Sequence, residues 1–99
     1  SIIKELVAEV EEELGAKLEY DSLNYARLVT HLRFALERIE SRENNTNPLL
    51  DSIKKDFKDT YRIAGKLAEI IESRFDYQVP EDEKGYLALH LQRLKRDFN

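Results

Sequence analysis

Apolar residues recur every three or four positions in five separate segments of this chain, and this spacing limits its fold more than any other feature. Such spacing places the apolar side chains on one face of an α-helix, and we find no segment patterned as a strand. With three glycines and two prolines, the chain also lacks the turn-forming residues that an all-β sandwich needs. Its 99 residues suffice for one domain and not for two. We therefore predict an all-α fold, a compact five-helix bundle in a single domain.

Residues typical of helix ends separate the predicted helices. Gly15 is placed to end the first helix as a glycine cap, and Asp21 is placed to begin the second. Asn47 followed by Pro48 predicts the cap and the first residue of the third helix. Gly65 lies inside the fourth helix, where it predicts a close approach between two helices. The predicted helices span about residues 2–14, 21–41, 49–58, 60–75 and 80 onward.

The first and the fifth predicted helices differ most in polarity. The fifth contains the sequence Tyr-Leu-Ala-Leu-His-Leu at residues 86–91. Apolar groups around a helix indicate burial on all sides, in a core or against another subunit. On the first helix, in contrast, glutamates occupy the outer face, where we expect ordinary solvation. These glutamates are Glu5, Glu9, Glu12 and Glu13.

The composition excludes several classes of protein. Because the chain has no cysteine, it has no disulfide framework, cysteine-based zinc finger, iron–sulfur cluster or thiol nucleophile, and it fits a reducing cytoplasm. No apolar run approaches the roughly 20 residues of a membrane span, and no signal-peptide pattern opens the chain. A net charge of −4 opposes binding to nucleic acid, so we expect the basic residues Arg93, Lys95 and Arg96 to form a solvated face. Because the chain starts at Ser1 without an initiator methionine, we expect a domain excised from a larger protein.

Two histidines are the strongest candidates for chemistry, and both lie in apolar helices. His31 and His90 each border predicted core residues and share a helix face with charged groups. The simpler interpretation is that both rings are neutral, hydrogen-bonded residues at the edge of the core. Metal binding is disfavoured because neither histidine has a second ligand three or four positions away, and hydrolysis because no hydroxyl nucleophile shares its helix face. We expect no metal, no cofactor and no enzymatic activity.

Phosphoryl acceptance fits these residue types better. A neutral imidazole is nucleophilic near physiological pH. A carboxylate can hold the other ring nitrogen in the productive tautomer, and guanidinium groups can receive phosphoryl oxygens. Glu83, Arg38 and Arg93 are available for these roles. Composition alone does not choose between a phosphoryl acceptor and a pair of structural histidines.

Two stretches around these histidines have the form of paired signatures. The first, at residues 25–38, reads Tyr-x-Arg-x-x-x-His-Leu-x-Phe-x-x-x-Arg. The second, at residues 80–91, is an acidic segment followed by Tyr-Leu-x-x-His. Together they resemble the two signatures of the PTS regulation domain (PRD), in the right order, and the resemblance covers essentially the whole chain. The Tyr-x-Arg start and the Tyr-Leu-Ala-Leu-His form resemble the second PRD of a tandem more than the first.

The resemblance implies a regulatory domain of a BglG/LicT-type transcriptional antiterminator or a related activator, with a five-helix fold that pairs as a homodimer. It implies that the sugar phosphotransferase system (PTS) phosphorylates His31 and His90, with HPr and enzyme II components as donors. Arg38, Glu83 and Arg93 match positions near the histidines, where they would contact the phosphate or orient the rings. Residues 1–99 would then be one PRD, a fragment of a larger cytoplasmic regulator that binds RNA through a separate domain and does not insert into the membrane.

Two hypotheses about function follow. In the first, reversible histidine phosphorylation shifts the dimerisation state of the domain. In the second, the chain is a constitutive helical dimerisation module whose histidines are structural. Site-directed changes that mimic the phosphate charge at His31 or His90 distinguish the two, because they alter association specifically only in the first.

Overall fold

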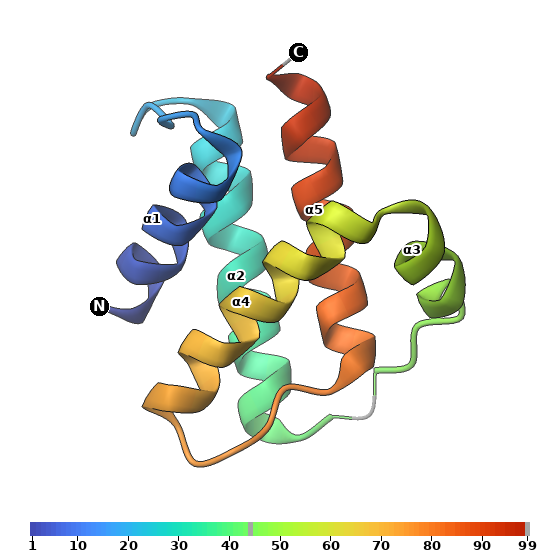
Figure 1. Ribbon diagram of the computed structural model, residues 1–99. Helices are drawn as coiled ribbons and strands as arrows, with labels where there is room; N and C mark the ends of the chain where they lie inside the picture. The colour runs from blue at the N-terminus through green and yellow to red at the C-terminus, as the bar shows by residue number, and fades with distance from the viewer. Residues whose placement is uncertain (44, 99) are drawn as a thin grey trace.

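The regular structure of the chain consists of α-helices (Figure 1). The computed structural model describes residues 1–43 and 45–98. Its helices are α1 (Ile2–Leu14), α2 (Leu23–Ser41), α3 (Leu50–Asp56), α4 (Lys58–Arg74) and α5 (Glu81–Asp97). The prediction of an all-α, five-helix fold is confirmed. In the described part of the chain, none of the helices combines the length and the apolar character that crossing a membrane requires.

Caps fix the ends of α1 and the start of α2. Gly15 ends α1 in the left-handed conformation (φ 66°), as predicted, because glycine adopts a positive φ without steric cost. The second helix is predicted to begin near Asp21, and its cap lies one residue later. The Oγ atom of Ser22 accepts a hydrogen bond from the backbone N–H of Tyr25 (3.1 Å), so Ser22 is the cap and α2 begins at Leu23. Asp21 lies in the turn before this cap.

The segment that leads into α3 differs from the prediction. Asn47 does not cap the helix directly, because its Oδ1 atom accepts a hydrogen bond from the backbone N–H of Leu49 (3.0 Å) and forms a turn, after which α3 begins at Leu50. The Nδ2 atom of Asn47 donates to the backbone carbonyl of Asp82 in α5 (3.4 Å). Asn47 therefore ties this turn to the first turn of α5. At its other end α3 stops at Asp56, and Phe57 alone separates it from α4.

The glycine that permits a close approach is Gly85, and the prediction for Gly65 is wrong. A Cβ atom added at Gly85 would lie 2.6 Å from Nδ2 of Asn47 and 3.0 Å from Cδ1 of Leu50. A Cβ atom added at Gly65 would meet nothing within 4 Å. The helical pattern shows that each glycine lies within a helix, but it does not show which side of that helix meets a neighbour.

Substitution by alanine is expected to change the free energy of unfolding in opposite directions at the two glycines. Gly65→Ala is expected to raise the free energy of unfolding by about 0.5–1 kcal/mol, because alanine loses less backbone entropy than glycine in a helix. Gly85→Ala is expected to lower it by about 1–3 kcal/mol, because the added methyl group overpacks against the buried Asn47. Urea unfolding of both variants measures these changes. A Gly85→Ala variant as stable as Gly65→Ala would contradict the packing of α5 against the 47–50 segment.

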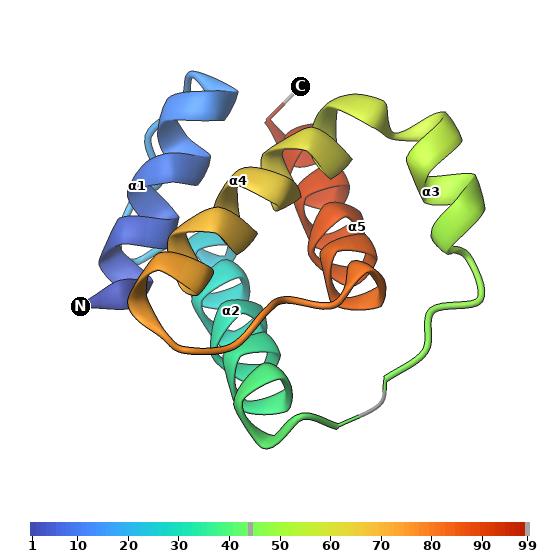
Figure 2. The same ribbon diagram turned by 60° about the horizontal axis from the view of Figure 1, so that its bottom comes forward.

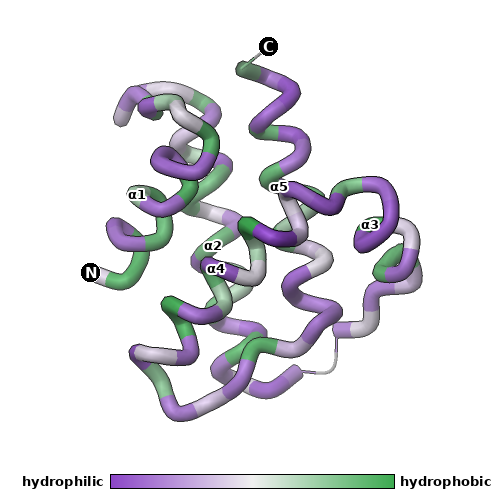
Figure 3. Tube along the Cα trace, viewed as in Figure 1, coloured by the Kyte–Doolittle hydropathy of each residue, from purple (hydrophilic) through white to green (hydrophobic). Residues whose placement is uncertain are grey.

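α5 lies at the centre of the fold. It packs most extensively against α4 and also contacts α2 and α3, while α1 packs against α2 and α4 (Figures 1 and 2). Figure 3 shows that apolar positions alternate with polar ones along the helices, as expected when each helix buries one side. The core takes residues from every helix. Its largest fully buried apolar side chains are Leu6, Leu32, Ile53, Ile63, Leu67, Ile71 and Leu91.

The core of this domain alone does not bury the fifth helix on all sides, and burial of its remaining surface against another subunit stays a prediction. Leu87, Ala88 and Leu91 are buried, but Leu89 is partly exposed and Arg93 is exposed. The reason is that the neighbours α2, α3 and α4 leave part of the circumference of α5 open to solvent.

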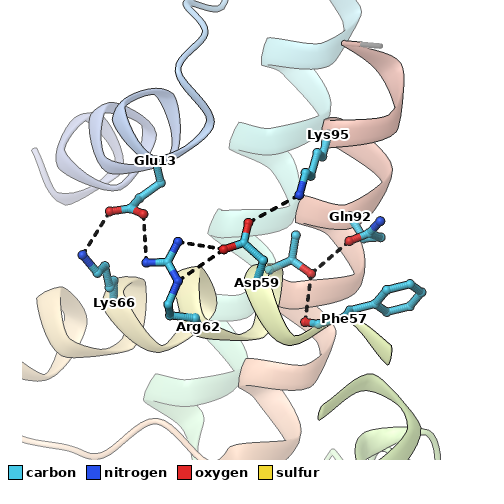
Figure 4. Close-up of polar contacts among 8 residues, drawn as sticks. Glu13, Phe57, Asp59, Arg62, Lys66, Gln92 and Lys95 are labelled. Carbon is cyan, nitrogen blue, oxygen red and sulfur yellow. Dashed lines mark hydrogen bonds and ion pairs between the residues drawn. The ribbon is translucent and has the colours of Figure 1, made fainter. Parts of the chain in front are cut away.

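A chain of ion pairs runs from α1 across α4 to α5 (Figure 4). Glu13 pairs with Arg62 and Lys66 of α4, at 3.0 Å each, and its side chain is 16% exposed. Asp59 of α4 pairs with Arg62 (2.8 Å) and with Lys95 of α5 (3.4 Å). The expectation of ordinary solvation is therefore wrong for Glu13, since basic residues of α4 face α1 at this point, and Lys95 is likewise engaged in an ion pair.

Two further glutamates of α1 also have partners. Glu5, expected to be solvated, pairs with Arg74 at the end of α4. Glu11 accepts a hydrogen bond from the backbone N–H of Leu18 (2.8 Å) and so fixes the loop that follows α1.

Candidate functional site

The two histidines lie face to face between α2 and α5. His31 belongs to α2 and His90 to α5; their ring centroids are 3.6 Å apart and their planes differ by 18°, so the rings stack. The two helices pack together and run in opposite directions (Figure 1). The fold therefore joins the two histidines that the sequence singled out, although they are far apart along the chain.

The contacts between α2 and α5 repeat after two helical turns. Arg38 follows His31 by seven residues on α2, Glu83 precedes His90 by seven residues on α5, and Arg38 pairs with Glu83. Because seven residues are about two turns, the histidine stack and the ion pair lie on the same side of each helix. They are two successive contacts along one helix–helix interface.

A pocket opens beside the histidine stack, at the next repeat along this interface. Asn24 lies seven residues before His31 and Asp97 seven residues after His90, and both line the pocket. The full lining consists of Asn24, Arg27, Leu28, His31, His90, Arg93, Leu94 and Asp97. The pocket therefore places two guanidinium groups and one carboxylate beside two imidazole rings.

Both imidazoles are neutral at physiological pH. Burial lowers the pKa of His31 below its ordinary value of 6.5, and the positive charges of Arg93 and Arg38 lower it further. Burial is also the main reason that the pKa of His90 falls to about 4. The facing His31 ring and then Arg93 add to this effect. A neutral imidazole keeps a free electron pair on one nitrogen, so either ring can act as a nucleophile.

The lowered pKa values predict a pH dependence. A histidine whose native pKa is below its unfolded value stabilises the fold fully above about pH 6.5, and this contribution is lost as the pH falls toward the native pKa. For His90 the loss extends from about pH 6.5 to about pH 4. We expect an NMR titration of the ring protons to place the midpoint of His90 near pH 4. A midpoint at or above pH 6.5 would contradict the buried, stacked placement of the ring.

A matched variant isolates this effect from the titration of the many carboxylates. His90→Gln removes the histidine whose neutral form the fold requires. The stability advantage of the unchanged chain over His90→Gln is therefore expected to shrink as the pH is lowered from 7 to 5, as measured by urea unfolding at each pH. An advantage that grows over this range would show that the sign of the pKa shift is wrong.

Arg38 and Glu83 form a buried ion pair with two hydrogen bonds. The Nε atom of Arg38 donates to Oε2 of Glu83 (2.9 Å), and Nη2 donates to Oε1 (3.0 Å). The side chain of Glu83 is 2% exposed and that of Arg38 is 28% exposed. Asn45 adds a hydrogen bond from its Nδ2 atom to Oε2 of Glu83 (3.4 Å). The hydrogen bonds to Glu83 raise the pKa of the Arg38 guanidinium, and the pair fixes α2 against α5.

The predicted site residues fall into two groups in the structure. His31, His90 and Arg93 line the pocket together. Arg38 and Glu83 bind each other two turns away, although the charge of Arg38 still lowers the pKa of both rings. Within residues 1–43 and 45–98, no group of three or more histidine, aspartate or glutamate side chains is placed to hold a metal ion.

Sequence reasoning gave no role to several residues that belong to this region. Arg27 occurs in the first signature, and it lines the pocket. Asn24 and Asp97 could have been found from the repeat of seven residues on each side of the histidines, had the pairing of α2 with α5 been known. Asn45 has no such signal, because only the folded chain brings the loop before α3 to Glu83.

Comparison of the sequence with known proteins identifies the family of this chain. The PtsGHI operon antiterminator of Bacillus subtilis (strain 168) is 36% identical over 95 residues, which cover 94% of this chain and 34% of that protein. The transcription antiterminator LicT of the same organism is 28% identical over 96 residues, covering 94% and 35%. Protein GlcT of Staphylococcus aureus (strain JH9) is 27% identical over 101 residues, covering 100% and 36%. The chain thus spans about a third of the length of these curated relatives. The family model described as PRD domain matches residues 4–94, and the chain therefore belongs to the PRD family.

Proposed function

We propose that this chain is a regulatory domain of a transcriptional antiterminator or activator, controlled by reversible phosphorylation of His31 and His90 by the sugar phosphotransferase system. The observation that carries the proposal is the stack of two neutral imidazoles at a pocket lined by Arg27 and Arg93. Membership of the PRD family supports it, as do the names of two relatives, which describe antiterminators. In this role the domain accepts a phosphoryl group and is not itself an enzyme.

The phosphoryl transfer needs only groups that the two proteins supply. The donor is a phosphohistidine, and the unprotonated nitrogen of His31 or His90 forms the new N–P bond as the N–P bond of the donor breaks. The electron pair of the broken bond returns to the donor ring. Each ring keeps the proton on its other nitrogen, so no further acid or base is consumed. Burial favours the reaction, because it keeps the accepting ring neutral.

The charged residues around the histidines divide the remaining tasks. Arg93 and Arg27 line the pocket and receive the phosphoryl oxygens through charge-assisted hydrogen bonds. Arg38 and Glu83 act at a distance of two turns. Their ion pair sets the register of α2 against α5, and this register brings the two rings into the stack.

HPr, sugar-specific enzyme II components or both are the proposed phosphoryl donors. The parent protein would bind RNA through a segment outside this chain, in keeping with the acidic net charge of −4. The proposed location is the cytoplasm, where the phosphotransferase proteins and nascent RNA meet.

Phosphorylation would act by changing the association of two copies of the domain. Leu23 and Phe34 on α2 are 63% and 52% exposed, and they lie about three turns apart on one side of the helix that carries His31. An exposed apolar surface of this kind fits a homodimer interface. Each new charge-assisted contact contributes roughly 1.5–3 kcal/mol, and about 5.5 kcal/mol moves a two-state equilibrium from 1:99 to 99:1. Two contacts per subunit therefore suffice for a switch.

Incubation with HPr, enzyme I and phosphoenolpyruvate tests the proposal. The expected result is acid-labile phosphate on the folded chain, and its loss in a His31→Gln/His90→Gln double variant. Omission of HPr is the control for direct transfer from enzyme I, and addition of an enzyme II component tests the alternative donor. Absence of acid-labile phosphate with every donor would refute the proposed function.

A further inference from the structure

The stacking of the two histidines limits how many phosphoryl groups the domain can carry. We propose that His31 and His90 share one site that holds a single phosphoryl group at a time. Phosphorylation of one ring therefore prevents phosphorylation of the other. This inference rests on the proposed function and concerns the occupancy of the same pocket.

The geometry places both possible phosphoryl groups in one space. The rings are nearly parallel, with centroids 3.6 Å apart, and both line the same pocket between α2 and α5. A phosphoryl group on a ring nitrogen lies in the plane of that ring. If the accepting nitrogen of each ring faces this shared pocket, the two groups would project side by side from the stacked rings. Separating them requires that the stack open.

The charges of the pocket fit one phosphoryl group. Each group carries about −1.5 to −2 charges, so two groups repel each other about two to four times as strongly as two unit charges at the same distance. The pocket supplies the guanidinium groups of Arg27 and Arg93, while Asp97 adds a negative charge. The two guanidinium groups and the carboxylate give these side chains a net charge of +1, which one phosphoryl group already exceeds, so a second would be left uncompensated.

Arg38, the next basic residue along the interface between α2 and α5, is already paired with Glu83. Arg38 donates two hydrogen bonds to the 2%-exposed Glu83, and moving it toward a second phosphate would leave that carboxylate buried without its partner. The rings themselves already oppose each other's charge, because His31 contributes to the lowered pKa of His90. Transfer of a phosphoryl group from a donor phosphohistidine to the second ring would balance chemically as the first does. Among the described residues that line the pocket, however, no further basic side chain is left to pair with the product.

Intact-mass spectrometry of the 99-residue chain tests the proposal. The chain is phosphorylated to completion with HPr, enzyme I and phosphoenolpyruvate and kept at alkaline pH. We expect the unchanged chain to gain the mass of one phosphoryl group and no more. His31→Gln and His90→Gln are each expected to gain one as well. Phosphopeptide mapping of the unchanged chain is expected to find both histidines modified, with occupancies that add up to one.

The outcomes separate this inference from the proposed function. A fraction of the unchanged chain carrying two phosphoryl groups would overturn single occupancy and leave the proposed function standing. A single variant that remains unphosphorylated, together with modification of only one histidine in the mapped unchanged chain, would show that the second ring is not an acceptor and would overturn the exclusion. No uptake by any form would overturn the proposed function and this inference with it. The mapping requires no variant, so the test holds even if a glutamine variant fails to fold.

Discussion

Replacing Arg38 with methionine is expected to lower the free energy of unfolding by about 3–5 kcal/mol. The reason is that Glu83, with a side chain only 2% exposed, would keep its charge and lose both hydrogen bonds from Arg38. Among the described residues, Asn45 would remain as a partner of Glu83, through one longer hydrogen bond. Urea unfolding at pH 7 measures the loss.

Two matched variants show whether the loss comes from the buried carboxylate. Glu83→Gln removes the charge from the buried side and leaves Arg38, which is 28% exposed and can turn toward water, so its cost is expected to be smaller. Lys54→Met breaks the exposed pair with Glu81 and is expected to cost less than about 1 kcal/mol. Equal losses in Arg38→Met and Lys54→Met would contradict the role assigned to the Arg38–Glu83 pair.

Arg93→Ala is expected to slow phosphorylation by HPr by about 10- to 100-fold. Arg93 lines the pocket beside both rings, and a hydrogen bond to a charged group contributes roughly 1.5–3 kcal/mol, which corresponds to a rate factor of this size if the bond forms in the transition state. The same variant is also expected to raise the pKa of both histidines, because the charge of Arg93 contributes to lowering them. Initial rates of phosphate incorporation and a proton NMR titration measure the two effects.

Arg96→Ala is the control for net charge and for helix α5. Its side chain is 74% exposed and does not line the histidine pocket, and its contact with the pocket residue Asp97 is a long ion pair of 4.0 Å. We expect its phosphorylation rate to stay within about twofold of the unchanged chain, since exposed charges contribute little. Equal slowing by Arg93→Ala and Arg96→Ala would show that general charge, and not the pocket, governs the reaction.

Much of the fold follows from local sequence signals. Gly15 ends α1 where its position predicts, because the left-handed conformation that stops a helix is a property of that residue. The third helix was harder to predict, because Asn47 is used by partners that are remote in sequence: its amide reaches Asp82 of α5, and the turn it forms delays the helix to Leu50. Gly65 and Gly85 look alike in the sequence, and only the packing of α5 against the 47–50 segment distinguishes them.

The composition of the candidate site was predictable, but its arrangement was not. Periodicity and the two signatures single out His31 and His90, and the pocket contains both. The seven-residue spacing of Arg38 and Glu83 from the histidines is visible on each helix separately. Their pairing goes together with the antiparallel register of α2 and α5, which is a tertiary property. For the same reason the stacking of the two rings could not be derived from either helix alone.

Sedimentation velocity of the chain before and after phosphorylation tests most directly whether the histidine pair controls association. We predict a change of at least about tenfold in the dimer dissociation constant, equivalent to about 1.4 kcal/mol, and no such change in the His31→Gln/His90→Gln double variant. Intact mass confirms the modification in the same samples. An unaltered dissociation constant in a fully phosphorylated chain would contradict the proposed switch and favour a constitutive dimerisation module.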